Sequence, residues 1–365
     1  MKILFFDNSG IHTSAGLMCC EPNTGNFARE LRDLGNDIIF YGQIIIDSDT
    51  VHTYDLKANG IKVVGLKRKK NKLWNYICLY FNILFYVYKS DFVYIYYPNA
   101  FKYAAVISKL MGVKYGLYVR GMRGINTCVS RWMYKNAYTI FTVSDRFSSF
   151  IDNIVGREIA NTIRPMIPYS SEDICYHRLY EIKKNHFNIL FLARVAEDKG
   201  VKELFYAMKI LKDKGYSFHL TFIGDGEFME QTKDLIKKLE LDDWVLIRGA
   251  VYDIKEKKDY FLSSDIYILP TYHEGFPRTL YEAMIFGTPI VTTMVGGISA
   301  LMKDKYNCKE IEPHSVESVV NGLQYAMDNY SEMVSYAKQG FHTVEKIVDV
   351  NRLTHAQHLN QIINN

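Results

Sequence analysis

Residues 265–293 read DIYILPTYHEGFPRTLYEAMIFGTPIVTT, and this stretch decides the fold. The apolar run Ile266–Leu269 predicts a buried strand, and the β-branched run Ile290–Thr293 predicts a second one. Between them the pattern predicts a helix over 277–286 whose first residue is a proline, where the missing N–H costs nothing. Gly287 suits the left-handed position that ends such a helix. Strand, loop, helix and strand in this order predict a pocket at a strand's carboxyl end.

Two carboxylates eight residues apart face this pocket. Glu274 lies in the loop after the first strand, and Glu282 lies in the helix. Carboxylates accept hydrogen bonds from hydroxyls, while the first amides of a helix hold anions, so a nucleotide sugar fits the pair. The alternative is that Glu274 is a solvated loop residue and that Glu282 pairs with Arg278, which would contribute about 0.3 kcal/mol.

A second candidate anion site follows the apolar run that begins at Phe187. Arg194 and Lys199 stand at the two ends of the turn that leads from this predicted strand into a helix. Arginine offers a planar fork, lysine a mobile point charge, and the helix adds its dipole, which together predict a diphosphate clamp. The alternative is two ordinary surface charges.

The run EGFPRTLYEAMIFGTPIV, residues 274–291, resembles the glutamate-x7-glutamate signature of the family 4 retaining glycosyltransferases of the GT-B fold. The resemblance covers nearly the whole chain and is specific from about Leu190 to Gly297. It implies an α/β protein of two Rossmann-like domains that face each other across a central cleft. It also implies a UDP- or GDP-linked sugar as co-substrate, retention of anomeric configuration, and neither cofactor nor metal.

The resemblance assigns roles to these residues. In the family pattern Arg194 and Lys199 bind the donor's diphosphate, Glu274 contacts the sugar and Glu282 takes the ribose hydroxyls. We therefore expect Glu274, Arg194 and Lys199 to be catalytic, and we expect donor binding by Glu282 and by the residues that join the two glutamates, namely Gly275, Phe276, Pro277 and Arg278.

The acceptor side is expected in the first half of the chain. Gly25 with Asn26 is the nearest equivalent of the glycine-rich loop that holds the acceptor in the family, and a helix is predicted to begin near Asn26. Arg120 stands where many relatives carry a histidine, and with Arg123 and Arg131 it would suit an anionic acceptor. The alternatives are a flexible surface loop and ordinary loop arginines.

Charge is divided unevenly along the chain. Residues 1–165 carry 21 Lys and Arg against 12 Asp and Glu, whereas the remainder carries 23 against 28. The basic first half predicts an anionic partner, either an acidic acceptor or a membrane surface, and no nucleic acid.

One segment of this basic half is a candidate membrane contact. The cluster Lys67-Arg68-Lys69-Lys70 precedes Leu73–Lys89, which is dense in aromatic and aliphatic residues. Such a combination is typical of a helix that lies at an anionic membrane surface. A buried helix of the first domain with a solvated basic lead-in is the equal alternative.

The pattern of alternating strands and helices breaks between Arg164 and Phe187, where we expect the interdomain linker. The predicted domains are an acceptor-binding domain over 1–165 and a nucleotide-sugar-binding domain over 166–345. The resemblance implies that a last helix, within 346–365, crosses back to the first domain.

Three further patterns bear on chemistry and location. Asp47-Ser48-Asp49 resembles a metal-binding triplet of the other large glycosyltransferase fold, but we interpret it as a turn. The six cysteines, of which Cys19 and Cys20 are adjacent and the others scattered, fit neither a disulfide framework nor a zinc site. The apolar run at the N-terminus is too short for a signal peptide. We expect a cytoplasmic protein, with the inner face of the cell membrane as a possible site of action.

The residues together with this resemblance imply a retaining, metal-independent glycosyltransferase that moves a sugar to a hydroxyl of a glycan or lipid-linked acceptor in bacterial surface polysaccharide synthesis. Two alternatives stay open. One is a nucleotide-sugar epimerase or hydrolase on the same fold, and the other is a non-catalytic nucleotide-sugar-binding protein.

Overall fold

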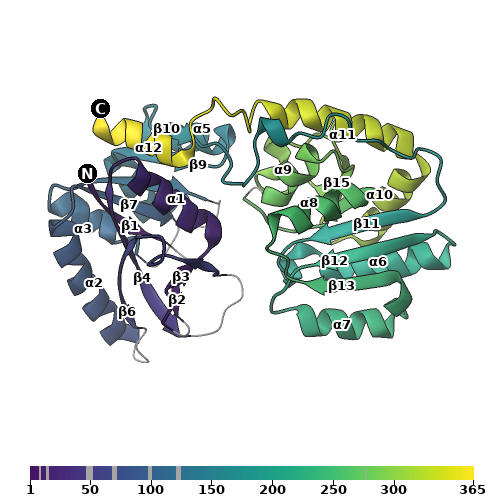
Figure 1. Ribbon diagram of the computed structural model, residues 1–365, viewed down its shortest axis with the longest axis horizontal. Helices are drawn as coiled ribbons and strands as arrows, with labels where there is room; N and C mark the ends of the chain where they lie inside the picture. The colour runs from purple at the N-terminus through teal and green to yellow at the C-terminus, as the bar shows by residue number, and fades with distance from the viewer. Residues whose placement is uncertain are drawn as a thin grey trace. The chain divides into compact units, whose positions relative to one another are not determined.

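The computed structural model describes residues 1–7, 10–13, 16–46, 52–67, 72–97, 101–120, 125–275 and 277–365. The chain forms two compact units, the first comprising Met1–Met166 with Leu353–Asn365 and the second Ile167–Arg352 (Figure 1). In each unit helices cover a largely parallel sheet. The predicted fold class, α/β with two Rossmann-like units, is confirmed.

The second unit has a six-stranded sheet in the described residues, with all pairs parallel and the order β13-β12-β11-β14-β15-β16. In chain order this is 3-2-1-4-5-6, the arrangement of dinucleotide-binding sheets. The strands are β11 (Phe187–Leu192), β12 (Phe218–Ile223), β13 (Val245–Gly249), β14 (Ile266–Leu269), β15 (Ile290–Thr293) and β16 (Lys309–Ile311).

Six helices surround this sheet within the described residues. They are α6 (Val201–Asp213), α7 (Met229–Lys238), α8 (Ile254–Ser263), α9 (Arg278–Ile285), α10 (Val316–Asp328) and α11 (Tyr330–Glu345). The stretch that decides the fold behaves as predicted. Both of its strands, β14 and β15, are buried along their whole length. Gly287, just after α9, has a φ of +67°, and Pro277 directly precedes α9, which begins one residue after the predicted helix start.

The described strands of the first unit form a larger sheet with the order β10-β9-β8-β7-β1-β4-β2-β3-β5, and β6 also pairs with β4. Their bounds are β1 (Lys2–Phe6), β2 (Ile11–Thr13), β3 (Cys19–Cys20), β4 (Asp37–Ile46), β5 (Tyr54–Asp55), β6 (Lys62–Lys67), β7 (Phe92–Tyr97), β8 (Lys114–Val119), β9 (Thr139–Thr142) and β10 (Ala160–Thr162).

Helices pack on both faces of this sheet. One face is covered by α1 (Pro22–Asp33) together with the last helix of the chain, α12 (His355–Asn364), whose His355 lies among buried aromatic rings. The other face is covered by α2 (Lys72–Tyr88), α3 (Ala104–Leu110), α4 (Cys128–Asn136) and α5 (Asp145–Val155). Across the described residues, no helix combines the length and the apolar character that crossing a membrane would require.

Candidate functional site

The strand order of the second unit indicates where a ligand binds. Strand β11 pairs with β12 on one side and with β14 on the other, so the order of the strands reverses at the β11–β14 pair. In open parallel sheets ligands bind outside the carboxyl ends of the strands at this point. Lys199 follows β11, and Glu274 follows β14. The two predicted residues therefore leave the sheet at the same edge and at the same switch point.

The structure brings these two side chains together. The Lys199 Nζ donates a hydrogen bond to the Glu274 Oε1, although 75 residues separate them in the chain. Lys199 is 7% exposed, so its ammonium and the carboxylate form a nearly buried ion pair. Gly200 follows with a φ of +67°, and a Cβ atom there would lie 2.0 Å from the carbonyl oxygen of Pro270. Only glycine allows the Lys199 turn to approach the end of β14 so closely.

Backbone contacts hold the 271–275 loop against the same turn. The Tyr272 amide donates to the carbonyl oxygen of Asp198 at 2.8 Å, and the Thr271 hydroxyl donates to it at 3.1 Å. On the other side Gly296, with a φ of +58°, leaves no room for a Cβ atom, which would lie 1.9 Å from the Glu274 carbonyl oxygen. The backbone of Glu274 is therefore fixed by two neighbouring loops, and this limits the positions that its carboxylate can reach.

Glu282 is the most deeply placed of the predicted residues. It lies in α9 and is 5% exposed. Burial raises the pKa of its carboxyl group, while Lys257 and Arg278 oppose this rise. Within the described residues its carboxylate has no hydrogen bond or ion pair. The alternative salt bridge to Arg278 is therefore absent from this part of the structure, and the carboxylate keeps its capacity to accept hydrogen bonds from a ligand.

Arg194 occupies a more exposed position than Lys199. Its Nη1 lies 2.9 Å from a carboxylate oxygen of Glu227, and its Nη2 lies 3.4 Å from one of Asp198. The guanidinium is thus neutralised by two surface carboxylates in the structure.

The remaining predicted donor residues lie around the start of α9. Gly275 and Pro277 lead into the helix, and Arg278 is its first residue. Phe276 lies outside the described residues. This segment connects the Glu274 loop to the helix that carries Glu282.

Sequence reasoning missed residues whose contribution depends on tertiary packing. The positive charge of Lys257, in α8, opposes the rise in the pKa of Glu282. The distance between these two residues in the sequence follows no pattern that would predict this interaction. The close backbone approaches of Gly200 and Gly296 could not be predicted from the sequence, because the carbonyl oxygens that they approach, those of Pro270 and Glu274, belong to distant segments. Asp198 holds the 271–275 loop through its backbone carbonyl, which carries no sequence signal.

The prediction for the glycine-rich acceptor loop is wrong in its placement. Helix α1 begins at Pro22 and not near Asn26, because the Glu21 side chain accepts a hydrogen bond from the Thr24 amide and caps the helix. Gly25 and Asn26 are therefore helical. Gly25 is buried where a Cβ atom would lie 2.2 Å from the Tyr54 ring, so the glycine allows α1 to pack on β5.

Arg120 follows β8 at the carboxyl edge of the first sheet. Its Nη1 lies 4.0 Å from the Oδ1 of buried Asp7, and its guanidinium lies 5.4 Å from the Tyr96 ring and 5.9 Å from the Tyr118 ring. Asp7 offsets part of the charge that was expected to attract an anionic acceptor. Arg123 lies outside the described residues.

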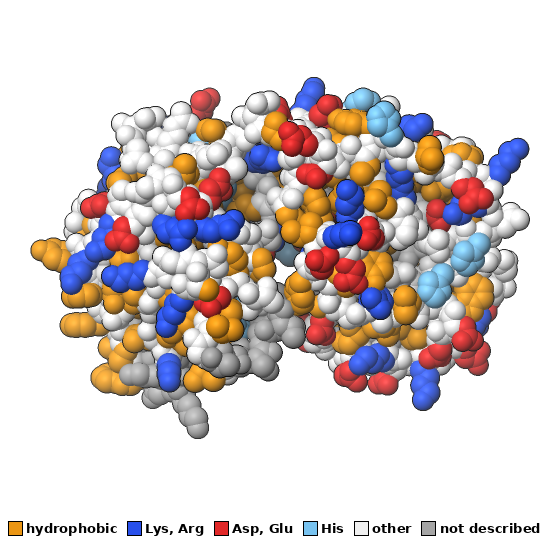
Figure 2. Space-filling model, viewed as in Figure 1, with side chains coloured by type: hydrophobic (Ala, Val, Ile, Leu, Met, Phe, Trp, Pro, Cys, Tyr) orange, Lys and Arg blue, Asp and Glu red, His pale blue; other side chains and the backbone are white. Residues whose placement is uncertain are grey.

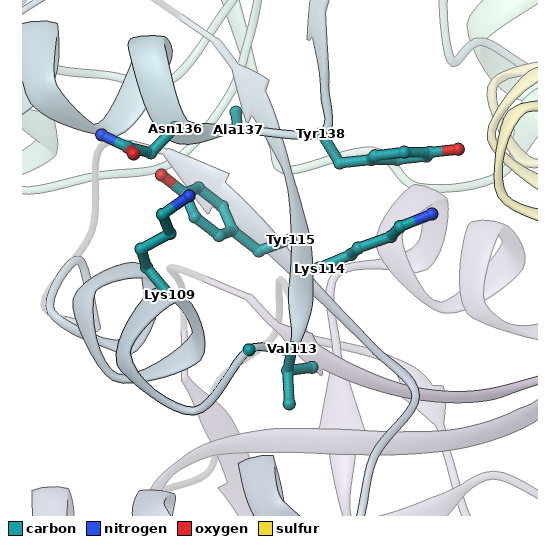
Figure 3. A pocket seen from close by; sticks show the side chains of 8 residues that line it. Lys109, Val113, Lys114, Tyr115, Asn136, Ala137 and Tyr138 are labelled. Carbon is teal, nitrogen blue, oxygen red and sulfur yellow. The ribbon is translucent and has the colours of Figure 1, made fainter.

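A cavity of about 250 Å³ lies at the opposite, amino edge of the first sheet (Figure 3). It is built by the ends of α3 and α4 and the starts of β8 and β9. The carbonyl ends of two helices disfavour an anion here, and Lys114 stacks on the Tyr138 ring at 4.1 Å. None of the predicted site residues lines it; those that do are Lys109, Gly112, Val113, Lys114, Tyr115, Asn136, Ala137 and Tyr138.

Comparisons with known proteins point to the second unit. Residues 176–343 match a model of the family described as Glycosyl transferases group 1. An uncharacterized glycosyltransferase of Haemophilus influenzae is 32% identical over 148 residues, which are 40% of this chain and 41% of that protein. The amylovoran biosynthesis glycosyltransferase AmsK of Erwinia amylovora is 36% identical over 121 residues, which are 32% of this chain and 30% of AmsK. These alignments span less than half the length of the curated relatives.

The fold extends the likeness to the whole chain. The crystal structure of the Anabaena protein HepE in complex with UDP-glucose matches 100% of this chain and 98% of HepE, with a TM-score of 0.69 and 19% sequence identity. At this identity the likeness shows the fold alone. Both relatives are named as glycosyltransferases, which does not favour the epimerase, hydrolase or sensor alternatives. The chain thus has the fold of the GT-B glycosyltransferases, and its residues 176–343, around Lys199, Glu274 and Glu282, match the group 1 family.

Proposed function

We propose that this chain is a retaining glycosyltransferase that moves a sugar from a UDP- or GDP-linked donor to a hydroxyl of a glycan or lipid-linked acceptor. The observation that carries the proposal is the partly buried contact of Lys199 with Glu274 at the switch point of the second sheet. A cation beside a carboxylate suits the junction between a diphosphate and a sugar. The relatives that act in polysaccharide synthesis, such as AmsK, support surface polysaccharide as the product.

Each residue has a distinct role in this proposal. The Lys199 ammonium and the first amides of α9 bind the diphosphate. Arg194 also binds it, once its guanidinium has exchanged Glu227 for the diphosphate. Glu282 accepts hydrogen bonds from the ribose, since its carboxylate is buried with no hydrogen bond in the described residues. Glu274 faces the sugar, where its negative charge stabilises the positive charge that develops at the anomeric carbon.

The chemistry needs no cofactor in this proposal. As the bond from the anomeric carbon to the phosphate oxygen breaks, the leaving diphosphate gains charge, which Lys199 and the helix amides stabilise. The acceptor oxygen forms the new bond on the same face of the sugar, and its proton passes to the leaving phosphate. Asp47 and Asp49, which we interpret as a turn, lie outside the described residues. We place the reaction in the cytoplasm.

The proposal is tested by incubating the protein with a panel of labelled nucleotide sugars and following nucleotide release with and without candidate acceptors. Glu274→Gln should lower turnover more than donor affinity, because its charge matters most in the transition state. Glu230→Gln removes an exposed carboxylate from α7 and is the matched control. Release of nucleotide at full rate without acceptor would support a hydrolase instead, and equal turnover of both variants would remove Glu274 from the site.

A further inference from the structure

Helix α2 in the first unit is apolar on two opposite faces. Its inner face, with Leu79, Ile83 and Val87, is fully buried against the sheet. Its outer face carries large side chains that are exposed, among them Phe81 at 76%, Tyr88 at 76% and Trp74 at 56%. The outer face is defined by Trp74, Ile77, Phe81, Leu84, Phe85 and Tyr88.

These six residues form one continuous stripe. At 3.6 residues per turn they span an arc of about 100°, which is the width of the apolar face that a helix normally turns toward a protein core. Figure 2 shows hydrophobic side chains gathered over α2 at the outline of the first unit. Exposed aromatic and aliphatic groups in such a row mark an interaction surface, because single exposed apolar residues are common but contiguous ones are not.

The composition of the sequence segment that contains α2 favours one kind of partner. Residues 56–144 contain fifteen Lys and Arg and a single acidic residue, Asp91, whose carboxylate accepts a hydrogen bond from the Lys2 amide. Lys89, at the end of α2, holds its ammonium 4.0 Å from the centre of the Phe85 ring. Helices α2, α3 and α4 have no acidic residue that would repel an anionic surface.

We propose that the outer face of α2 is an interfacial membrane-binding surface that inserts into the headgroup region of an anionic bilayer. The apolar stripe supplies side chains that enter the acyl boundary, about 5–10 Å deep, and Trp and Tyr are the aromatic residues suited to the headgroup level. Lys89, whose ammonium lies over the Phe85 ring of the stripe, meets anionic lipid, as does the basic cluster Lys67-Arg68-Lys69-Lys70 that precedes α2 in the sequence. Since the inner face of α2 packs on the sheet, the helix lies along the membrane and keeps its place in the fold. This surface is independent of the donor site, and the proposal does not rest on the glycosyltransferase reaction.

Cosedimentation with vesicles tests the apolar stripe. The full chain should bind vesicles of phosphatidylcholine mixed with phosphatidylglycerol and bind pure phosphatidylcholine less. Phe81→Ser with Phe85→Ser should lower the partition coefficient into mixed vesicles by about tenfold or more, since two rings no longer insert. Leu179→Ser is the matched control, because Leu179 is 94% exposed and lies in the second unit. It should bind like the wild type.

A second comparison separates lipid from protein partners. Replacing Lys67, Arg68, Lys69 and Lys70 with glutamine should weaken binding to mixed vesicles by about fivefold for each charge near the surface. Wild-type vesicle binding by both the Phe81/Phe85 variant and this basic-cluster variant would overturn the proposal. Loss of self-association in the Phe81/Phe85 variant, without any loss of vesicle binding, would instead assign the stripe to a second copy of the chain.

Tryptophan fluorescence gives a readout of insertion that does not depend on affinity. The chain has three tryptophans, so Trp132→Phe with Trp244→Phe leaves Trp74 as the single reporter. Its emission should shift to the blue on binding mixed vesicles and should be quenched by lipids brominated near the headgroup. Unchanged emission from a vesicle-bound protein would show that α2 does not insert and would overturn the proposal.

Discussion

Replacing Glu282 by glutamine should make the second unit more stable and the donor site weaker. The wild-type carboxylate is 5% exposed and lacks a hydrogen bond among the described residues. Its pKa is raised, so the burial that opposes ionisation outweighs the attraction of Lys257 and Arg278. Glutamine keeps the shape without the charge. We expect a gain in unfolding free energy of about 1 kcal/mol, because burial disfavours a carboxylate more than a neutral amide.

That gain should appear as a rise in Tm of about 2–4 °C in the absence of ligand, given the size of the second unit. The size of this gain depends on pH. A carboxyl group whose pKa is raised in the folded state contributes stability that is complete below its unfolded pKa and is lost as pH rises through the folded pKa. The difference between Glu282→Gln and the wild type should therefore be present at neutral pH and vanish below about pH 4.

Donor affinity should change in the opposite direction. If the Glu282 carboxylate accepts hydrogen bonds from the ribose, their loss should cost about 1.5–3 kcal/mol, or roughly 10- to 150-fold in Kd. Differential scanning fluorimetry measures the stability, and calorimetric titration with UDP and GDP measures the affinity. Glu230→Gln, on the surface of α7, controls for loss of one negative charge. A variant that is less stable and binds the nucleotide as well as the wild type would refute the reasoning, because it would show that Glu282 is a structural residue.

The other predictions concern the turn and the ion pair beside Glu282, and the role of metal. Gly200→Ala should lower the free energy of unfolding, measured by chemical denaturation, by about 1 kcal/mol or more beyond the loss in the control Gly215→Ala. Both glycines have a positive φ, but only at Gly200 would the added Cβ atom lie 2.0 Å from a carbonyl oxygen. Equal losses in the two variants would show that this close approach is unimportant. Lys199→Met and Glu274→Gln should each lower the free energy of unfolding by about 3 kcal/mol, and the double variant should lose less than the sum of the two single losses, because the two side chains form an ion pair. Additive losses in this double-mutant cycle would contradict a coupled pair. Activity should persist in excess chelator, and a loss restored by adding a divalent cation would contradict a metal-free reaction.

Local sequence patterns determined the framework of this protein. Apolar and β-branched runs predicted the strands β11, β14 and β15, and Gly287 marked a helix end, because these preferences act over a few neighbouring residues. The residues after the strand ends, Lys199 and Glu274, were also recognisable, since a parallel sheet presents its loops at one edge. Candidate site residues that are recognised by their residue type and by their position after a strand could therefore be predicted from the sequence.

Only the tertiary structure decided which distant atoms meet. The contact of Lys199 with Glu274 joins residues that lie 75 apart, and the charge of Lys257 reaches Glu282 from another helix. For Gly25 the sequence indicated a loop, but capping by Glu21 and packing on Tyr54 place it inside α1. The exposure of the outer face of α2 is equally a tertiary result, because the helix is apolar on two opposite faces and its sequence does not show which of them is buried. Packing on the sheet buries the inner face of α2, and the outer face stays exposed as the surface that we propose to bind the membrane.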